Sequence, residues 1–394
     1  MILHSCTSSL VACNVYITSA ASAALPSLLS RAQDHCRQLR LRMQPQQQQQ
    51  HPDENNTRVS AASAAAAVVH AYADVPYDRS SFHLAGRSDC VTEVAIRLIQ
   101  NALDEIELKN NNNDDDASLT ADKDTSESRH PFVGLVDHVA VMPISCKEED
   151  FVPTHSAAAT AAREIGSNIL QSNSINVHYY GLACPKNTPL ATVRRRNTSF
   201  FNSGGAHDSI IGGNNNNNEK LLGQESRYEK GECTIGTPVY FVENYNIRLT
   251  PNVDFSTAKT LTQALRGRNI PTKGMGVPGV EALTLPYNRD VTHGGNVFEV
   301  ACNLTEPKTG SVKKMEEELE KWIQQQKQQH HSTNDKDNND QYYNRDYFIE
   351  KAYRVGTTEE QCLTVLKEGN DDDEYWMQYD QQVFSRFKGF LGQR

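Results

Sequence analysis

His130 is the residue whose sequence context best suits chemistry. It opens the segment HPFVGLVDH, in which Pro131 restricts the preceding backbone to an extended form. The histidine is therefore expected at the entrance of a strand at 135–142, which is apolar on both faces except at Asp137 and His138. An imidazole exchanges protons near neutral pH and can act as a general acid or base. A structural or solvated loop histidine is the alternative interpretation.

Two segments, 165–207 and 255–280, contain no acidic residue, although the chain has a formal net charge of −10. Their cations are Lys186, Arg194, Arg195, Arg196, Lys259, Arg266, Arg268 and Lys273. Such clusters are typical either of solvated helix faces or of a site for an anionic small molecule. Nucleic acid is not an expected partner, because an acidic chain without a basic domain cannot neutralise phosphates.

The nine cysteines form no CxxC pair, and no paired histidine spacing accompanies them. Neither a zinc site nor a disulfide framework is therefore indicated. The signatures of P-loop, dinucleotide-binding and α/β-hydrolase enzymes are absent as well. No run of about 20 apolar residues occurs, so no membrane-spanning helix is predicted. We expect a protein without a metal cofactor and without a membrane partner.

Hydrophobic periodicity predicts two units of strands and helices that would position these residues. The first has predicted strands at 9–18, 67–75, 80–86, 135–142 and 175–180, and helices at 23–38, 89–108, 155–171 and 188–196. The second has predicted strands at 238–249, 277–286, 296–304 and 347–355, and helices at 254–266, 311–325 and 357–367. Both orders indicate a split βαβ unit with one uncovered sheet face. Packing the two uncovered faces together would create a groove, where ligands tend to bind.

Polar runs interrupt these elements. They are the Gln-rich 43–56, the Asn/Asp-rich 109–129, the Gly/Asn-rich 203–230, the Gln/Asn-rich 326–345 and the acidic 369–374. Because they lie between predicted elements, we interpret them as surface insertions. An interaction protein in which these runs are the functional parts is the least favoured reading.

The segment HPFVGLVDHVAVMPI at 130–144 resembles the His-Pro motif of formiminotransferases. These folate-dependent enzymes take the formimino group from formiminoglutamate, an intermediate of histidine catabolism. The resemblance continues in chain order through LVACNVYIT (10–18), DVPYDRSSFHLAG (74–86), the predicted helix at 89–108, VHYYGLA (177–183), TVRRR (192–196), IGTPVYFVENYNIRL (235–249), GVEAL (279–283) and NVFEVACNLTEP (296–307). It is greater to the plant-type stand-alone members than to the animal bifunctional enzyme.

The resemblance implies an α+β fold of two tandem ferredoxin-like subdomains with a ligand groove between their sheets. The implied boundaries are an N-terminal subdomain at 8–202, a flexible linker at 203–235, a divergent C-terminal subdomain at 236–368 and a tail at 369–394. In the family the first strand and helix lie at the extreme N-terminus. Residues 8–38 are thus expected to be fold, and a cytoplasmic location is favoured over a mitochondrial or plastid one.

The resemblance also implies roles for individual residues. His130 corresponds to the acid/base on formimino transfer, and Arg79, Arg194 and Arg195 match positions that the family fills with arginine. Carboxylates on both substrates would give these cations partners. Asp74 could orient a substrate amine or His130, or simply form the turn before Pro76.

The resemblance also implies further binding residues, a co-substrate and a set of histidines without a role. Tyr180 and Gly181, in VHYYGLA, complete the expected folate- and substrate-binding residues. Tetrahydrofolate is the implied co-substrate, no metal is implied, and a homodimer is possible. The histidines without motif support, which are expected to be replaceable, are His83, His138, His178 and His293.

A catalytically inactive protein of the same fold, which binds a folate-like or other anionic ligand, is the alternative function. The family's Asp-Gly-Pro loop, associated with folate, has no counterpart in 203–235, which is Gly/Asn-rich instead. Retention of His130 favours the enzyme, and the different loop favours the inactive binder.

Overall fold

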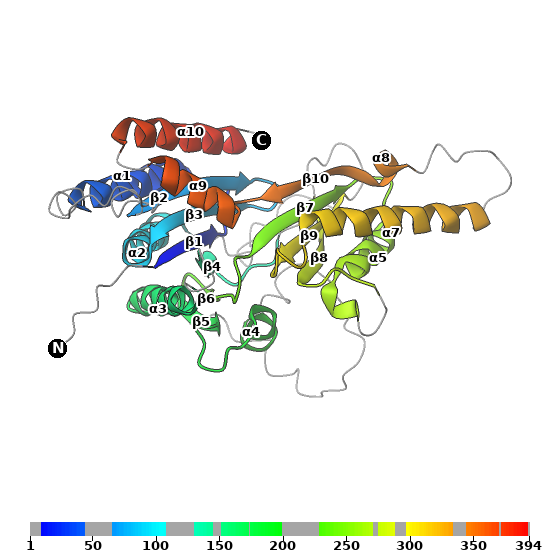
Figure 1. The fold of residues 1–394 in the computed structure, drawn as a ribbon, viewed down its shortest axis with the longest axis horizontal. Helices are drawn as coiled ribbons and strands as arrows, with labels where there is room; N and C mark the ends of the chain where they lie inside the picture. The colour runs from blue at the N-terminus through cyan, green and yellow to red at the C-terminus, as the bar shows by residue number, and fades with distance from the viewer. Residues whose placement is uncertain are drawn as a thin grey trace, which may run out of the picture. The chain divides into compact units, whose positions relative to one another are not determined.

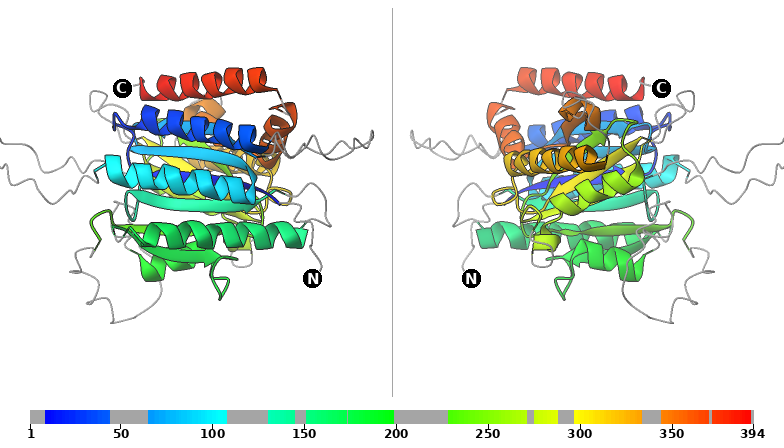
Figure 2. Two further views of the ribbon diagram at one scale, coloured as in Figure 1. Left: turned by 90° about the vertical axis from the view of Figure 1, so that its left-hand side faces the viewer. Right: turned by 90° about the vertical axis from the view of Figure 1, so that its right-hand side faces the viewer.

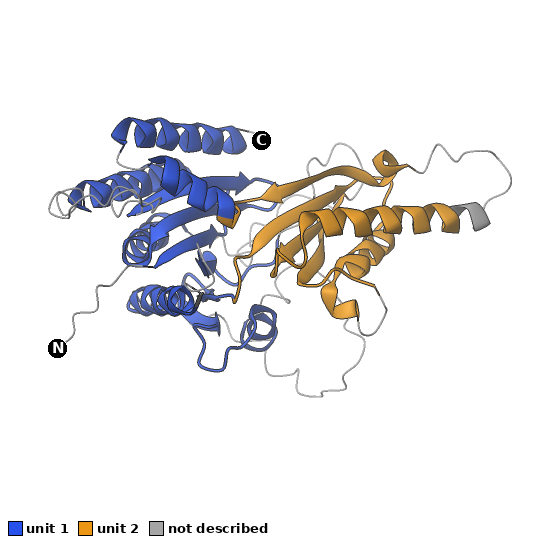
Figure 3. Cartoon of the chain, in the orientation of Figure 1, with its two compact units in different colours: residues 1–126, 130–238, 360–394 blue, residues 127–129, 239–359 orange. Residues whose placement is uncertain are grey.

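The computed structural model describes residues 9–43, 65–107, 130–144, 151–172, 174–198, 228–270, 275–287, 297–333, 344–369 and 372–392. These residues form two compact units. Unit 1 holds the described residues up to Pro238 and again from Glu360, and unit 2 holds Val239–Glu359 (Figure 3). Each unit contains one sheet and several helices, so the predicted α+β class is confirmed.

Unit 1 is built on a six-stranded sheet in the order β2-β3-β1-β4-β6-β5 (Figure 1). Its strands are β1 (Leu10–Ile17), β2 (Ala66–Asp74), β3 (Arg79–Arg87), β4 (Val136–Pro143), β5 (Asn176–Gly181) and β6 (Glu232–Thr237). The strands β2, β3, β1 and β4 pair antiparallel, whereas β6 runs parallel to β4 and β5 runs parallel to β6. Five of these strands are the predicted ones, and β6 is an addition.

The two faces of this sheet differ in polarity. Successive side chains of a strand point to opposite faces, and alternate residues of β1 from Val11 to Ile17 lie in the hydrophobic core. Tyr16 lies on the opposite face, where the strand register pairs it with Ser81 of β3 and His138 of β4. Polar side chains of neighbouring strands therefore line up on this second face, which we call the polar face.

Three long helices cover the apolar face. They are α1 (Leu25–Met43), α2 (Ser88–Glu105) and α3 (Phe151–Leu170), and they lie side by side in Figure 2. The short helix α4 (Leu190–Asn197) contacts β5 and β6 instead. Unit 1 is completed by α9 (Glu359–Gly369) and α10 (Asp373–Leu391).

Helix α10 packs on β2 and α1. Val383 and Phe387 are buried in the core of unit 1, and the Phe387 ring lies 5.6 Å from that of Phe82. The hydroxyl of Tyr379 donates to the carbonyl of Val69 at 2.8 Å. The prediction of a tail at 369–394 is therefore wrong for the described part of that range, because these residues include a helix that packs in the core of unit 1.

Unit 2 is built on a four-stranded antiparallel sheet in the order β10-β7-β9-β8. Its strands are β7 (Glu243–Leu249), β8 (Val280–Pro286), β9 (Phe298–Leu304) and β10 (Ile349–Val355). Its helices are α5 (Phe255–Leu265), the 3₁₀ turn η4 (Gly267–Asn269), α7 (Val312–Thr333) and α8 (Arg345–Phe348). Leu261 of α5 and Leu319 and Trp322 of α7 pack with Val300 on one sheet face, which leaves the other face to polar residues.

The unit boundaries differ from the sequence prediction. The segment 236–368 was expected to form the second subdomain, whereas residues from Glu360 join unit 1. The linker expected at 203–235 includes the start of β6, which lies between β4 and β5 of the first sheet. Its residues 203–227 lie outside the described part of the chain.

Candidate functional site

Four residues from separate elements of unit 1 meet on the polar face. Arg79 begins β3, Asp137 lies in β4, Arg194 lies in α4, and His130 precedes β4. Nη2 of Arg79 lies 2.7 Å from Oδ2 of Asp137, and Nη2 of Arg194 lies 3.3 Å from the same oxygen. Nη1 of Arg79 lies 2.8 Å from both ring nitrogens of His130. We call these four residues the Asp137 cluster.

An irregularity in β4 places Asp137 in this cluster. Along β1, Tyr16 pairs with His138 and Ile17 pairs with Val136, so the register shifts by one residue between them. Strict alternation would put Asp137 on the apolar face, opposite to His138. The extra residue of a bulge redirects side chains, and here Val136 enters the core while Asp137 reaches the two arginines.

Asp137 is an acceptor that its surroundings fix in place. Its side chain has no solvent exposure. Oδ1 accepts from the backbone N–H of Val133 at 3.0 Å, and Oδ2 takes both guanidinium contacts. A buried carboxylate requires such partners, because an unpaired buried charge is strongly destabilising. One negative charge here faces two positive charges, so the cluster carries an excess of positive charge.

His130 is half-buried and neutral in this setting. Burial, together with the nearby charge of Arg79, holds the pKa of His130 well below its ordinary value. Nδ1 lies 2.7 Å from the carbonyl oxygen of Pro131. We therefore assign the tautomer in which Nδ1–H donates to Pro131, and Nε2 accepts from Arg79. Tyr77 contacts the ring edge-on, with the centroids 5.6 Å apart.

A layer of rings lies beside the cluster. The His138 ring lies between Tyr16 and Tyr180, with centroid distances of 5.6 and 5.4 Å. Nδ1 of His138 lies 3.1 Å from the hydroxyl oxygen of Thr234, to which Nη2 of Arg194 donates at 3.4 Å. The guanidinium of Arg79 lies over the Tyr16 ring at 4.7 Å. That His138 can be replaced with little kinetic effect stays a prediction, and these contacts place its ring beside the Asp137 cluster.

The structure brings together only some of the expected site residues. His130, Arg79 and Arg194 meet, and Tyr180 joins through the His138 ring. Arg195, the next residue of α4, is exposed.

Asp74 and Gly181 both occupy turns. Asp74 accepts from the backbone N–H of Tyr77 at 3.3 Å and from the hydroxyl of Tyr72 at 3.2 Å, which matches the turn interpretation. Gly181 ends β5 with a φ of +56°, and a Cβ there would lie 2.0 Å from the carbonyl oxygen of Thr237. Its lack of a side chain is thus what the turn toward α4 requires.

The other histidines expected to be replaceable lie elsewhere. His83 is buried on β3, with Nε2 3.1 Å from the Ser81 hydroxyl oxygen. Nε2 of His178 lies 3.1 Å from Oε1 of Glu232. His293 lies outside the described residues.

Sequence reasoning missed four contributors: Asp137, Tyr16, Tyr77 and Thr234. Asp137 gave a usable signal, because it is an acid within an otherwise apolar strand. Tyr16 and Thr234 gave none, because their contribution depends on strand pairing between distant segments.

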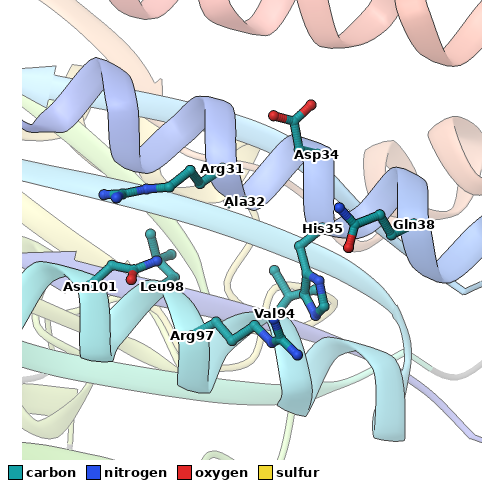
Figure 4. A pocket seen from close by; sticks show the side chains of 9 residues that line it. All are labelled: Arg31, Ala32, Asp34, His35, Gln38, Val94, Arg97, Leu98 and Asn101. Carbon is teal, nitrogen blue, oxygen red and sulfur yellow. The ribbon is translucent and has the colours of Figure 1, made fainter.

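A hollow of about 280 Å³ lies between α1 and α2 (Figure 4). It is lined by Arg31, Ala32, Asp34, His35, Gln38, Val94, Arg97, Leu98 and Asn101. Its basic side chains already have acidic partners: Arg31 pairs with Glu105 at 2.6 Å, and His35 and Arg97 both contact Glu93. None of its lining residues belongs to the Asp137 cluster, so it is no part of the candidate site.

The described residues contain no group of three His, Cys, Asp or Glu side chains that could hold a metal ion. In the same part of the chain, no helix is long and apolar enough to cross a membrane.

Comparisons with known proteins agree with the resemblance found in the sequence. Residues 48–210 match the sequence model of the formiminotransferase domain, N-terminal subdomain. The matched range contains all four residues of the Asp137 cluster. A protein of Arabidopsis thaliana described as a formiminotransferase cyclodeaminase-like protein is 26% identical over 248 residues, which are 61% of this chain and 72% of that protein. The similarity to formiminotransferases is thereby confirmed.

Proposed function

We propose that this chain, related to the formiminotransferases through residues 48–210, moves a formimino group from formiminoglutamate to tetrahydrofolate. The observation that carries the proposal is the Asp137 cluster. It places a neutral His130 beside two arginines that share a single buried carboxylate. Tetrahydrofolate enters as co-substrate, and no metal is required.

The excess positive charge suits a substrate carboxylate. Asp137 contacts both Arg79 and Arg194, so the orientation of the two guanidinium groups is set before a ligand arrives. Guanidinium groups bind carboxylates in planar, often bidentate geometry. Both formiminoglutamate and folate carry carboxylates. A bound carboxylate would balance the positive charge of the two arginines that Asp137 alone does not neutralise.

Formimino transfer requires a group that first accepts a proton and then donates one. A ring amine of the reduced folate forms a bond to the amidine carbon of the donor, and a tetrahedral carbon results. His130 takes the proton that the attacking amine loses. It then returns a proton to the glutamate nitrogen as the carbon–nitrogen bond breaks, so that glutamate leaves as an amine. Such positioned acid–base catalysis typically contributes ~10²–10⁴-fold.

His130 must first exchange its hydrogen bond with Arg79. In the structure Nε2 accepts from Nη1 of Arg79, which occupies the lone pair needed to take a proton. A bound carboxylate would draw Arg79 toward itself and offset its charge. Both effects raise the pKa of His130, so substrate binding would activate the base.

We also propose that the two units are tandem ferredoxin-like subdomains. The strand order β2-β3-β1-β4 in unit 1 and the order β10-β7-β9-β8 in unit 2 both correspond to a βαββαβ sequence of elements. Each sheet has one face without core contacts that carries an arginine–carboxylate pair, Arg79 with Asp137 and Arg248 with Glu299.

A catalytically inactive ligand-binding protein is the second candidate. The observation that favours it is the contact of Arg79 with both ring nitrogens of His130, which holds the histidine in its unprotonated form. Incubation of the purified chain with formiminoglutamate and tetrahydrofolate, followed by quantification of released glutamate, separates the two. Release supports the transferase. Calorimetric binding of either compound without release would support the inactive binder.

A further inference from the structure

We propose that Thr234 is a positioning residue that orients Arg194 in the candidate site. The inference rests on the proposed function, in which Arg194 meets a substrate carboxylate. Thr234 acts through Arg194 and not on the substrate itself. It is fully buried on β6, the strand that lies between β4 and β5 of the first sheet.

Strand pairing places the Thr234 side chain on the polar face of the sheet of unit 1. Its neighbours Cys233 and Ile235 lie in the hydrophobic core, so alternation directs Thr234 to the opposite face. In the parallel pairing of β6 with β4, Thr234 is the register partner of His138. The hydroxyl therefore lies beside the Asp137 cluster as a consequence of the sheet register.

The hydroxyl of Thr234 uses all of its hydrogen-bonding positions. Oγ1 donates to the backbone carbonyl of Asp137 at 3.1 Å, which sets the direction of its single hydrogen. A hydroxyl oxygen has two acceptor positions as well, and Nδ1 of His138 lies 3.1 Å and Nη2 of Arg194 lies 3.4 Å from it. We therefore assign the Nδ1–H tautomer to His138. An apolar side chain of the same shape could make none of these three contacts.

Two acceptors share Nη2 of Arg194. They are Oδ2 of Asp137 at 3.3 Å and Oγ1 of Thr234 at 3.4 Å. Both distances exceed the usual range of N–H···O bonds, so each contact is weak alone and the two together define the direction of the guanidinium. The helix that carries Arg194 constrains it little, because Val193 is the one buried residue of the fully described, eight-residue α4.

The hydroxyl distinguishes Arg194 from its neighbours in the arginine run. Arg195 and Arg196 are exposed, whereas Arg194 reaches the Thr234 hydroxyl on β6. Without that hydroxyl, the guanidinium could rotate about its contact with Asp137. Ligand binding would then have to restore the orientation, and the loss of preorganisation lowers affinity.

The carboxylate that Arg194 meets is assigned to formiminoglutamate. Asp137 joins Arg194 to Arg79, which contacts His130, so these cations lie next to the proposed acid–base group. In formiminoglutamate the α-carboxylate is adjacent to the nitrogen that carries the formimino group. The carboxylates of folate lie at the opposite end of the molecule from its reacting ring. The KM for formiminoglutamate is therefore the quantity that Thr234 should control.

The test compares three variants of the full chain. Thr234→Val keeps the shape of the side chain and removes the hydroxyl, and Thr234→Ser keeps the hydroxyl. Thr237→Val is the matched control, because Thr237 is also fully buried on β6 and its Oγ1 forms no hydrogen bond among the described residues. Each variant is also made with Arg194→Gln, and kcat and KM are measured from glutamate release.

Thr234→Val should raise the KM for formiminoglutamate by about three- to tenfold, as for the loss of one hydrogen bond. Its kcat should stay within about twofold, because the contact is present in both ground and transition states. Thr234→Ser and Thr237→Val should retain the wild-type KM. In the Arg194→Gln background, Thr234→Val should have no further effect, which separates Arg194 from the contact of Thr234 with His138.

Four results would overturn the proposal: an unchanged KM in Thr234→Val, an equal rise in Thr234→Ser, an equal rise in both backgrounds, or a loss confined to kcat. If Thr234→Val does not fold, Thr234→Cys replaces it, since a thiol hydrogen-bonds only weakly. If the wild-type chain releases no glutamate, the proposed function fails separately and urea unfolding decides. Thr234→Val should then cost less stability in the Arg194→Gln background than in the wild type, and equal costs would overturn the positioning role.

Discussion

Arg79 and Asp137, 58 residues apart in the chain, are joined by an ion pair of 2.7 Å that lies directly beside His130. The pair links the start of β3 to the bulge of β4 across the intervening strand β1. Because the same carboxylate oxygen also contacts Arg194, a single buried acid positions both arginines of the candidate site. The consequences of this arrangement can be measured.

Asp137→Asn should destabilise unit 1 strongly. The substitution keeps the shape of the side chain but leaves two guanidinium groups without their shared charge, a loss of about 3–5 kcal/mol for a broken buried pair. The free energy of unfolding in urea measures it. Asp89→Asn, which breaks the exposed pair with Arg87, is the matched control and should cost less than about 1 kcal/mol. Equal effects of the two substitutions would show that Asp137 does not hold the cluster.

Acidification should destabilise the fold from about pH 6.5 downward. Burial lowers the pKa of His70 to about 4, and the pKa values of His83, His130 and His138 lie well below the ordinary value. These groups stay neutral in the folded chain while the unfolded chain takes up protons below about pH 6.5, so their contribution is present above that pH and is lost on acidification. Each contributes a slope of up to about 1.4 kcal/mol per pH unit.

Asp380 should oppose this trend. Burial raises the pKa of its carboxyl to about 6, so the folded chain binds a proton that the unfolded chain does not bind until lower pH. As the pH falls from about 6 to about 4, this one group therefore increases the free energy of unfolding. The free energy of unfolding in urea, measured across pH 4.5–8, should depend more steeply on pH in Asp380→Asn and less steeply in His138→Gln. A stability that is constant over this range would contradict both assignments.

Gly181→Ala should destabilise the chain and displace α4. The positive φ and the 2.0 Å approach of the added Cβ to the carbonyl of Thr237 leave no room for a side chain, and the backbone turn that leads to Arg194 would have to move. We expect a loss of roughly 1–3 kcal/mol in urea unfolding. Gly389→Ala, in open space on helix α10, should instead be neutral or stabilising by up to about 1 kcal/mol. A larger loss of stability in Gly389→Ala than in Gly181→Ala would contradict the turn described at Gly181.

Phe387→Ala tests whether α10 is part of the first core. Removing a fully buried ring that contacts Phe82 should cost about 3–5 kcal/mol, whereas Met377→Ala on the exposed side of the same helix should cost little. Thermal unfolding compares the two variants. Similar melting temperatures would mean that the C-terminal helix does not contribute to the stability of unit 1.

The sequence predicted most elements and the meeting of His130 with Arg79 and Arg194. Short, mostly apolar runs define β1 and β4, and the His-Pro motif marks the entrance of β4. The parts that it did not predict depend on tertiary pairing. The bulge at Asp137 is a property of the register between two strands, and the place of β6 between β4 and β5 is set by parallel partners far away in sequence.

The C-terminal helix shows a different cause of failure. Its apolar positions Trp376, Val383 and Phe387 have helical spacing, yet they follow an acidic run that suggested a tail. Likewise, the run of three arginines in α4 could not reveal which one faces Asp137, because the choice depends on how a short helix sits on β5 and β6.

The role of His130 can be measured by the rate of glutamate release from formiminoglutamate and tetrahydrofolate, in the wild-type chain and in His130→Ala. His178→Ala, which alters a histidine that contacts Glu232 away from the cluster, is the control. His130→Ala should lower the rate by ~10²–10⁴-fold while substrate affinity stays within several-fold, and His178→Ala should retain activity. A His130→Ala chain as active as the wild type would show that His130 is not the acid–base group of the transfer.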